Sequence, residues 1–234
     1  MKTSLLSTSA LSLGFACALA VIPTTAPADQ IWEQRYNGPA NSNDMALAVA
    51  VDTAGNVVVT GKSLNASGDY DFYTAKYDSA DGHLLWEQRY DGPNQADDVA
   101  TCVVVDIARN VVVTGYSADR NSVDDPGHIS INTKFYTAKY DANGNLLWYH
   151  LGPDHGGADS IRAAVDASGN VIVANKDTVG SYTAKYDAAD GHLVWEHRYC
   201  GSCGEIGFGL GDVLTGVAVD GSGNVVVCGT AVVG

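Results

Sequence analysis

The stretch Phe72-Tyr-Thr-Ala-Lys-Tyr-Asp78 decides the fold, because it recurs at Phe135 to Asp141 and, with serine in the first place, at Ser181 to Asp187. A tryptophan follows each copy, at Trp86, Trp148 and Trp195. Repetition at this spacing is typical of architectures in which each copy packs against its neighbours. Residues present in every copy are therefore expected to pack the copies together before they serve any ligand.

Each copy divides into four short apolar or alternating runs. In the first copy they are Ala46 to Val51, Asn56 to Gly61, Tyr73 to Asp78, and His83 to Tyr90. The turn Asp52-Thr-Ala-Gly-Asn56 has counterparts of the pattern Asp-x-x-Gly-Asn at 166–170 and 220–224. An aspartate can bond the turn backbone and a glycine accepts positive φ, so these are predicted hairpin turns. Arg109 replaces the glycine in the second copy and predicts a turn that is strained or of another type.

The burial pattern differs along each copy. Val57 to Val59, Val103 to Val105 and Val111 to Val113 are apolar on both faces, which predicts sheets covered on both sides. The fourth run alternates charge with aromatic residues, as in Glu87 and Arg89, and reads as an exposed edge. We expect an all-β fold, a β-propeller of four-stranded antiparallel blades. The alternative, a parallel β-helix, has shorter coils that no hairpins join.

The N-terminus predicts a signal peptide over residues 1–28, with Lys2, an apolar stretch from Ala10 to Ile22, and cleavage after Ala28. A retained anchor and a lipoprotein at Cys17 are the alternatives. The propeller domain is then 29–234, or 206 residues (234 minus 28), with repeats at approximately 32–85, 86–147, 148–194 and a partial copy at 195–234. We expect an exported protein that is periplasmic, secreted or on the cell surface.

The negative net charge of this domain disfavours binding to anionic partners. Without Lys2 it has 12 basic and 27 acidic residues, a net charge of −15, which disfavours nucleic acid and anionic membranes. No stretch after the signal is apolar and long enough to cross a membrane. Cationic partners stay open, and so does the plain alternative that acidity only keeps an exported β protein soluble.

Two families share these motifs. The run of Asp-x-x-Gly-Asn-Val-Val-Val-Thr-Gly followed by Tyr-Thr-Ala-Lys-Tyr-Asp resembles the SBBP-type bacterial β-propeller repeat over essentially all of the mature chain. Asp78, Gly82 and Trp86 are also similar to the tryptophan-docking repeat of PQQ-type quinoproteins, and Asp187, Gly191 and Trp195 match in the same way. The first resemblance implies an exported repeat protein, and both imply that the tryptophans pack blades.

Three groups of residues could carry more than packing. Lys76, Lys139 and Lys185 share one strand position, which predicts either a charge pair between blades or a ring of cationic groups. Asp44, Asp98, Asp159 and Asp212 stand near the start of each innermost strand, where they could present carboxylates to a cation such as Ca²⁺ or instead cap turns.

Cysteines form the third group. Cys200-Gly-Ser-Cys203 predicts a local disulfide, with a metal or redox pair as the alternative, and no metal site is expected. Cys102 and Cys228 are expected to be buried small side chains.

The sequence predicts an exported, non-catalytic propeller that binds a protein or a glycan through the variable connections between second and third strands, because no catalytic motif is found. One alternative is a PQQ-dependent dehydrogenase with calcium, although neither cofactor is predicted; another is a propeller lyase or hydrolase using His155 and Asp159. Strand counting predicts about 3.5 repeats, an incomplete propeller, and self-association through an open blade edge.

Overall fold

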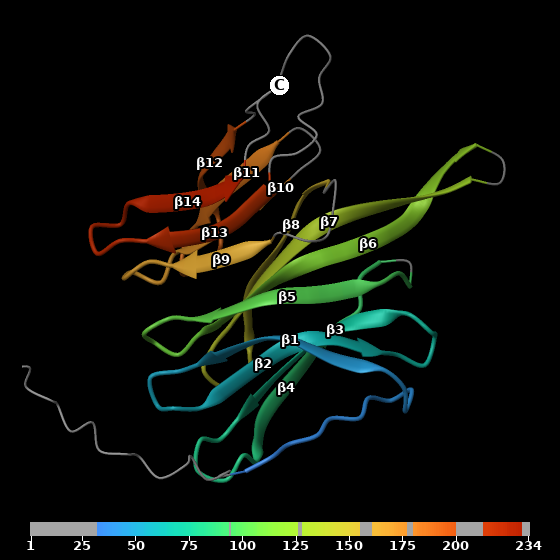
Figure 1. The fold of residues 1–234 in the computed structure, drawn as a ribbon, viewed down its shortest axis with the longest axis horizontal. Coiled ribbons are helices and arrows are strands. Elements are labelled where there is room, and N and C mark those ends of the chain that lie inside the picture. The colour runs from blue at the N-terminus through green and yellow to red at the C-terminus, as the bar shows by residue number, and fades with distance from the viewer. Residues whose placement is uncertain are drawn as a thin grey trace, which may run out of the picture. The chain divides into compact units, whose positions relative to one another are not determined.

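The computed structural model describes residues 32–93, 95–125, 128–154, 161–176, 180–199 and 213–230, and every regular element in these ranges is a β-strand. Three sheets have four antiparallel strands each and a fourth has two (Figure 1). The first sheet contains β1 (Asp44–Val51), β2 (Val57–Leu64), β3 (Tyr70–Tyr77) and β4 (Leu84–Tyr90). The second contains β5 (Asp98–Val105), β6 (Val111–Asp125), β7 (His128–Tyr140) and β8 (Leu146–Asp154). The third contains β9 (Arg162–Val165), β10 (Val171–Lys176), β11 (Ser181–Tyr186) and β12 (Leu193–Tyr199), and the last contains β13 (Val213–Val219) and β14 (Val225–Thr230).

Each sheet is a simple meander, in which every strand pairs with the next along the chain. Successive sheets meet through their first strands: β5 contacts β1, β9 contacts β5, and β13 contacts β9. This is the arrangement of propeller blades, which pack face to face in chain order. The predicted all-β fold of four-stranded antiparallel blades is confirmed. No helix in the described ranges is long and apolar enough to cross a membrane.

Two hydrophobic cores lie between blades. The first joins Val58, Phe72 and Trp86 of the first blade to Val103, Tyr136 and Tyr140 of the second. The other joins Phe135 and Trp148 of the second blade to Ile161, Tyr182 and Tyr186 of the third. Equivalent positions of the repeat thus supply both cores, as the recurrence of the sequence predicts.

The predicted hairpin turn forms as its residues require. Asp52 Oδ1 accepts hydrogen bonds from the backbone N–H groups of Ala54 and Asn56, and Gly55 has a φ of 87°. The second blade keeps the same turn. Asp106 Oδ1 accepts a hydrogen bond from Asn110 N–H, and the N–H of Asp106 donates to the carbonyl of Asn110 as that of Asp52 does to Asn56. Arg109 therefore stands in the glycine position with a φ of 68°, in the left-handed region that disfavours a side chain.

A bulge recurs where the first strand passes the second. The register shifts between Ala46 and Ala48 in the first blade and between Ala100 and Cys102 in the second. Gly61 and Gly115 lie opposite, where an added Cβ would come within 1.9 Å of a carbonyl oxygen of the first strand. The glycine of Val-Val-Val-Thr-Gly is thus required by a close approach of two backbones.

The structure differs from the sequence pattern in three places, and the first contradicts the prediction of sheets covered on both sides. β1 is not covered on both sides, because Met45, Leu47, Val49 and Val51 are all exposed. The segment from Trp32 to Tyr36 forms no ladder, although Glu33 and Arg35 alternate with aromatic residues there as in the fourth run of each copy. The long connection from Tyr116 to Lys134 is an extension of the β6 and β7 hairpin, to which Ile129-Ser-Ile131 contributes an alternation of apolar and polar residues that suits a strand.

Candidate functional site

The two described members of the predicted aspartate set begin the innermost strands of their blades. Asp44 Oδ2 accepts a hydrogen bond from Gly38 N–H at 2.7 Å, and Asp98 Oδ2 accepts one from Gly92 N–H at 2.6 Å. Each carboxylate thus holds the Gly-Pro connection that enters its blade. Asp159 and Asp212 lie outside the described residues.

Asp98 is the more unusual of the two. Its side chain is fully buried, whereas that of Asp44 is only partly so, and in both residues Oδ1 has no hydrogen-bond partner among the described residues. Burial raises its pKa to about 7, and the nearby charges of Asp91 and Asp71 act in the same direction. This carboxyl group is therefore protonated over part of the physiological pH range.

Three further carboxylates gather where the connection between β2 and β3 lies beside the end of β4. Oxygens of Asp69, Asp71 and Asp91 lie within 4.8 Å of one another, in an arrangement that could accept a hard cation. Two donors already serve this cluster: Arg89 Nη1 lies 2.8 Å from Asp71 Oδ2, and Asn65 Nδ2 donates to both Asp69 and Asp71. Burial raises the pKa of Asp71. The sequence signal was the pair of aspartates flanking Tyr70, which occurs only in the first copy.

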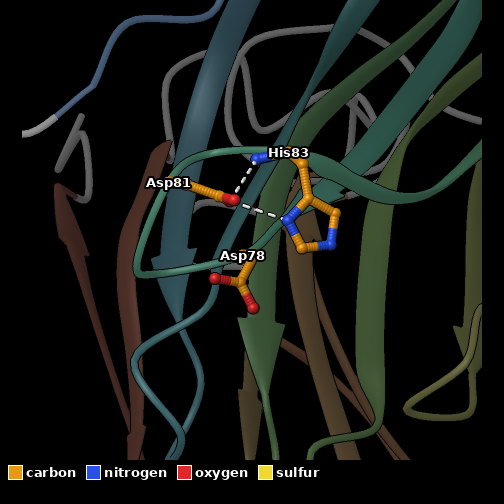
Figure 2. A group of neighbouring side chains, drawn as sticks. All are labelled: Asp78, Asp81 and His83. Atoms are coloured by element: carbon orange, nitrogen blue, oxygen red, sulfur yellow. Dashed lines mark hydrogen bonds and ion pairs between the residues drawn. The ribbon is translucent and has the colours of Figure 1, made fainter.

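A second group lies on the turn between β3 and β4. Figure 2 shows Asp78, Asp81 and His83, with Asp81 Oδ1 accepting hydrogen bonds from His83 N–H at 3.0 Å and from Nδ1 at 2.7 Å. The bond to Asp81 raises the pKa of His83, and the bonds from His83 lower that of Asp81. Asp187, Asp190 and His192 repeat the group in the third blade. Two carboxylates and an imidazole could bind a divalent ion, but the turn geometry accounts for all three side chains.

The three lysines of the repeat pair with aspartates of their own blades. Nζ of Lys76 lies 2.8 Å from Asp52, that of Lys139 lies 3.1 Å from Asp106, and that of Lys185 lies 2.8 Å from Asp166. The first two pairs are almost fully buried. Burial alone would raise the pKa of Asp166, yet the bonds from Lys185 and Asn170 lower it to about 2. The salt bridge is therefore within a blade, from the third strand to the first turn.

The same lysines also reach the next blade. Lys139 Nζ donates to the carbonyls of Gly169 and Ala188 at 2.8 and 3.2 Å, and Lys76 Nζ contacts the carbonyl of Ala142 at 3.5 Å. One ammonium group thus ties its own hairpin to two turns of its neighbour. These contacts match a packing role more closely than a ring of free cationic groups.

The tryptophans dock on glycines of the turn between third and fourth strands. A Cβ added to Gly82, Gly144 or Gly191 would lie 2.5 to 2.7 Å from the ring of Trp32, Trp86 or Trp148 respectively. All three glycines have positive φ. The indole N–H groups donate to the carbonyls of Ser79, Ala142 and Ala188, at 3.2, 3.1 and 3.4 Å. These three tryptophans each pack on a turn glycine and donate to a carbonyl of the same turn, which is the blade-packing role that the repeat predicts.

Trp195 differs from the other tryptophans. Its ring lies 5.3 Å from His197, between centroids, and faces a cavity of about 360 Å³. No carbonyl in the described part of the chain accepts its indole N–H. The tryptophan of the third blade thus borders an open groove.

The cysteines are only partly described. Cys200 and Cys203, the predicted disulfide, lie outside the described residues. Cys102 is half-buried, and burial raises its pKa, whereas Cys228 is exposed and forms one wall of the groove beside Trp195. The expectation that Cys228 is buried is wrong, because β14 has no covering strand in the described ranges.

Comparisons with known proteins add little to this geometry. No protein-family model matches the chain, and no curated protein matches it, so the SBBP-type and PQQ-type resemblances stay predictions. Among solved structures, the crystal structure of BamB from Moraxella catarrhalis is similar, with a TM-score of 0.41 and 17% sequence identity. The match covers 72% of this chain and 39% of BamB. A likeness at this level assigns neither a family nor a function.

Proposed function

We propose that this chain is an exported, non-catalytic β-propeller repeat protein that acts as a binding scaffold for another protein. The observation that carries the proposal is the exposed apolar stripe of β1, formed by Met45, Leu47, Val49 and Val51. Contiguous exposed apolar side chains mark surfaces that bind proteins. Export depends on the predicted signal peptide, which lies outside the described residues.

The repeat supplies its own comparison for this stripe. Met45 and Val49 are 52% and 66% exposed, whereas Val99 and Val103, which hold the same places in β5, are 4% and 6% exposed. The preceding blade covers β5, since Val103 belongs to the core that contains Trp86. The stripe of β1 is thus a surface of the kind that this fold normally buries.

The chemistry of the stripe favours a protein over a glycan. The four side chains of the stripe are aliphatic and offer neither an aromatic platform nor hydrogen-bond donors for sugar hydroxyl groups; Tyr36, Tyr73 and Tyr77 line the hollow beside the stripe. A hollow of about 230 Å³ beside it, lined by Tyr36, Met45 and Lys62 among others, could admit one protruding side chain. An apolar partner surface with one anchoring residue fits these features.

Photo-crosslinking in cells tests the proposal. A photoreactive benzoylphenylalanine replaces Val49 in the stripe, and the matched control carries it at Ser67, which is exposed on the connection between β2 and β3 of the same blade. We expect a discrete protein adduct from position 49 that is absent from position 67. A further chain with the photoreactive residue at Leu47 and the substitution Val49→Lys should lose the adduct, because a charge would enter the apolar contact.

Equal adducts at positions 49 and 67, or none at 49, would contradict the proposal. Binding of the purified protein to a glycan array without any protein adduct would favour the glycan alternative.

Incubation with PQQ and Ca²⁺ tests the dehydrogenase alternative: a quinone absorbance that co-elutes in stoichiometric amount would support it. Edman sequencing of the exported product should begin at Asp29.

A further inference from the structure

The groove beside Trp195 runs between the outer half of the third blade and the two-stranded sheet. One wall consists of Trp195, His197 and Tyr199 on β12, and the other of Leu214 on β13 with Val225 and Val227 on β14. β13 packs on β9 and β10 of the third blade, whereas side chains of β11 and β12 line the groove. The chain itself shows what normally fills this place.

Between the first and second blades, a hairpin covers the equivalent surface. Trp86 docks on the turn at Gly144, and its ring lies 6.1 Å from that of Tyr140. Tyr90, four residues after Trp86, stacks on Tyr136 with ring centroids 3.9 Å apart. The covering hairpin thus supplies two tyrosines from β7 and a left-handed glycine from its turn.

The first blade repeats this pattern with different residues. The ring of Trp32 lies 6.3 Å from that of Tyr77 and against Gly82. Tyr36, four residues after Trp32, stacks on Tyr73 at 3.9 Å. A tryptophan followed by a tyrosine four residues later therefore receives a strand Tyr-x-x-x-Tyr and the glycine of the turn that follows it.

Trp195 and Tyr199 have the same spacing but no such strand against them in the described ranges. Tyr199 is 64% exposed. The three described turns that could receive a tryptophan, which contain Gly82, Gly144 and Gly191, are each occupied by another tryptophan. Trp195 therefore needs a fourth turn, which the described residues do not provide.

Asp220 completes this surface. It occupies the turn between β13 and β14, in the place where Asp52, Asp106 and Asp166 each accept a lysine from the third strand of their blade. Asn224 Nδ2 donates a hydrogen bond to Asp220 Oδ2, as Asn56 does to Asp52. No lysine in the described part of the chain pairs with Asp220. Beside it, β14 pairs with β13 alone, and its other edge has no described strand partner.

We propose that Trp195, Tyr199, Asp220 and the free edge of β14 form a receptor for a β-hairpin supplied by another protein. Its first strand carries Tyr-x-x-Lys-Tyr and its turn carries a glycine with positive φ. The backbone of this strand pairs with β14, its tyrosines stack on Tyr199 and Trp195, and its lysine pairs with Asp220. The proposal goes beyond the one above, since it concerns a second surface and names the chemistry of its occupant.

A hairpin taken from the chain itself is the probe. The peptide Phe72 to Tyr90 spans β3, the turn and β4, and its two ends are paired in the structure. Labelled with a fluorophore, it is titrated into the purified full chain and its anisotropy is followed. We expect saturable binding of one peptide per chain. A head-to-tail cyclised form of the same peptide should bind more tightly, because less ordering accompanies its binding.

Matched variants locate the site. In the peptide, Gly82→Val should weaken binding about tenfold or more, because a Cβ there meets the tryptophan ring. In the protein, Trp195→Ala should weaken it by a similar factor, whereas Ser67→Ala in the first blade should not. Asp220→Asn in the protein and Lys76→Met in the peptide should each weaken binding, and the two losses combined should be smaller than their sum, because both changes remove the same ion pair.

Three results would overturn the proposal. One is failure of both linear and cyclised peptides to bind. Another is equal binding by the Gly82→Val peptide or by the Trp195→Ala protein. The third is formation of dimers without peptide that Trp195→Ala abolishes, because a second copy of the chain would then be the occupant. None of these results bears on the crosslink at Val49, so this proposal and the proposed function fail separately.

Discussion

Single residues of the repeat carry packing roles that the sequence shows in outline. The recurrence of Lys76, Lys139 and Lys185 predicts a shared partner, but it cannot say that the partner is the turn aspartate of the same blade. That choice depends on the register between β2 and β3, which places Lys76 opposite Val58, and on the short turn that brings Asp52 back over it. Spacing along the chain carries no such information.

Arg109 gives a stability prediction at the residue scale. It adopts the φ of 68° that its counterparts Gly55 and Gly169 adopt without strain. We expect Arg109→Gly to raise the free energy of unfolding by about 0.5–1 kcal/mol, since the relief of strain exceeds the added freedom of the unfolded chain. Urea denaturation measures it. As the matched reverse change, Gly223→Arg should be destabilising, because Gly223 has a φ of 84° in the same turn and an added Cβ there would meet nothing within 4 Å. A loss of stability in both variants would contradict the account.

Asp98 gives a pH dependence. Burial raises its pKa to about 7 in the folded protein, above the ordinary value of 3.8 that the unfolded chain keeps. The folded state therefore binds more protons between these values, so the contribution of Asp98 to stability is full below about pH 4 and is lost as the pH rises through 7.

We expect Asp98→Asn to be more stable than the parent at pH 8, by an amount on the order of 1–3 kcal/mol, because the amide is neutral and can still accept from Gly92 N–H. Below pH 4 the difference should vanish. Urea denaturation of both proteins from pH 4 to 8 checks this, and a pH-independent difference would show that the carboxyl group is ionised throughout.

At the scale of elements, the strands and their hairpins could be predicted from the sequence, but which faces of a strand are covered by a neighbouring blade could not. The sequence placed β1 to β4 within three residues of their observed bounds. The runs of β1 and β5 are both apolar, and the sequence does not show that a described blade covers β5 but not β1. The β6 and β7 extension was also missed, because the aspartates of this connection and its Pro126-Gly127 favour a turn or loop, although Ile129-Ser-Ile131 alternates as a strand does.

The salt bridge that spans two elements gives a further prediction. Lys139 and Asp106 are 1% and 2% exposed, so removing only the lysine leaves a buried charge unpaired. We expect Lys139→Met to lower the free energy of unfolding by about 3 kcal/mol. Lys185→Met should cost less, because that lysine is 17% exposed. Chemical denaturation of the two variants compares them; equal losses would argue that burial does not set the strength of the pair.

At the scale of the whole molecule, one docking device joins consecutive blades. Trp86 and Trp148 each meet a left-handed glycine of the next blade, and Trp32, which precedes the first blade, meets that of the first blade. The packing role of these residues could be predicted from their recurrence. That Trp195 stands apart could not, because its sequence surroundings are the same as those of Trp86. Only the position of neighbouring sheets distinguishes a docked tryptophan from one that borders a groove.

The most direct test of this account compares Trp148→Ala with Trp195→Ala by urea denaturation, followed by far-ultraviolet circular dichroism. Trp148 is buried against Gly191, so its removal should lower the free energy of unfolding by about 3–5 kcal/mol. Trp195→Ala should lower it by less than about 1 kcal/mol, because no described blade covers its ring. Equal losses in the two variants would contradict the claim that tryptophan docking joins the blades and leaves Trp195 open.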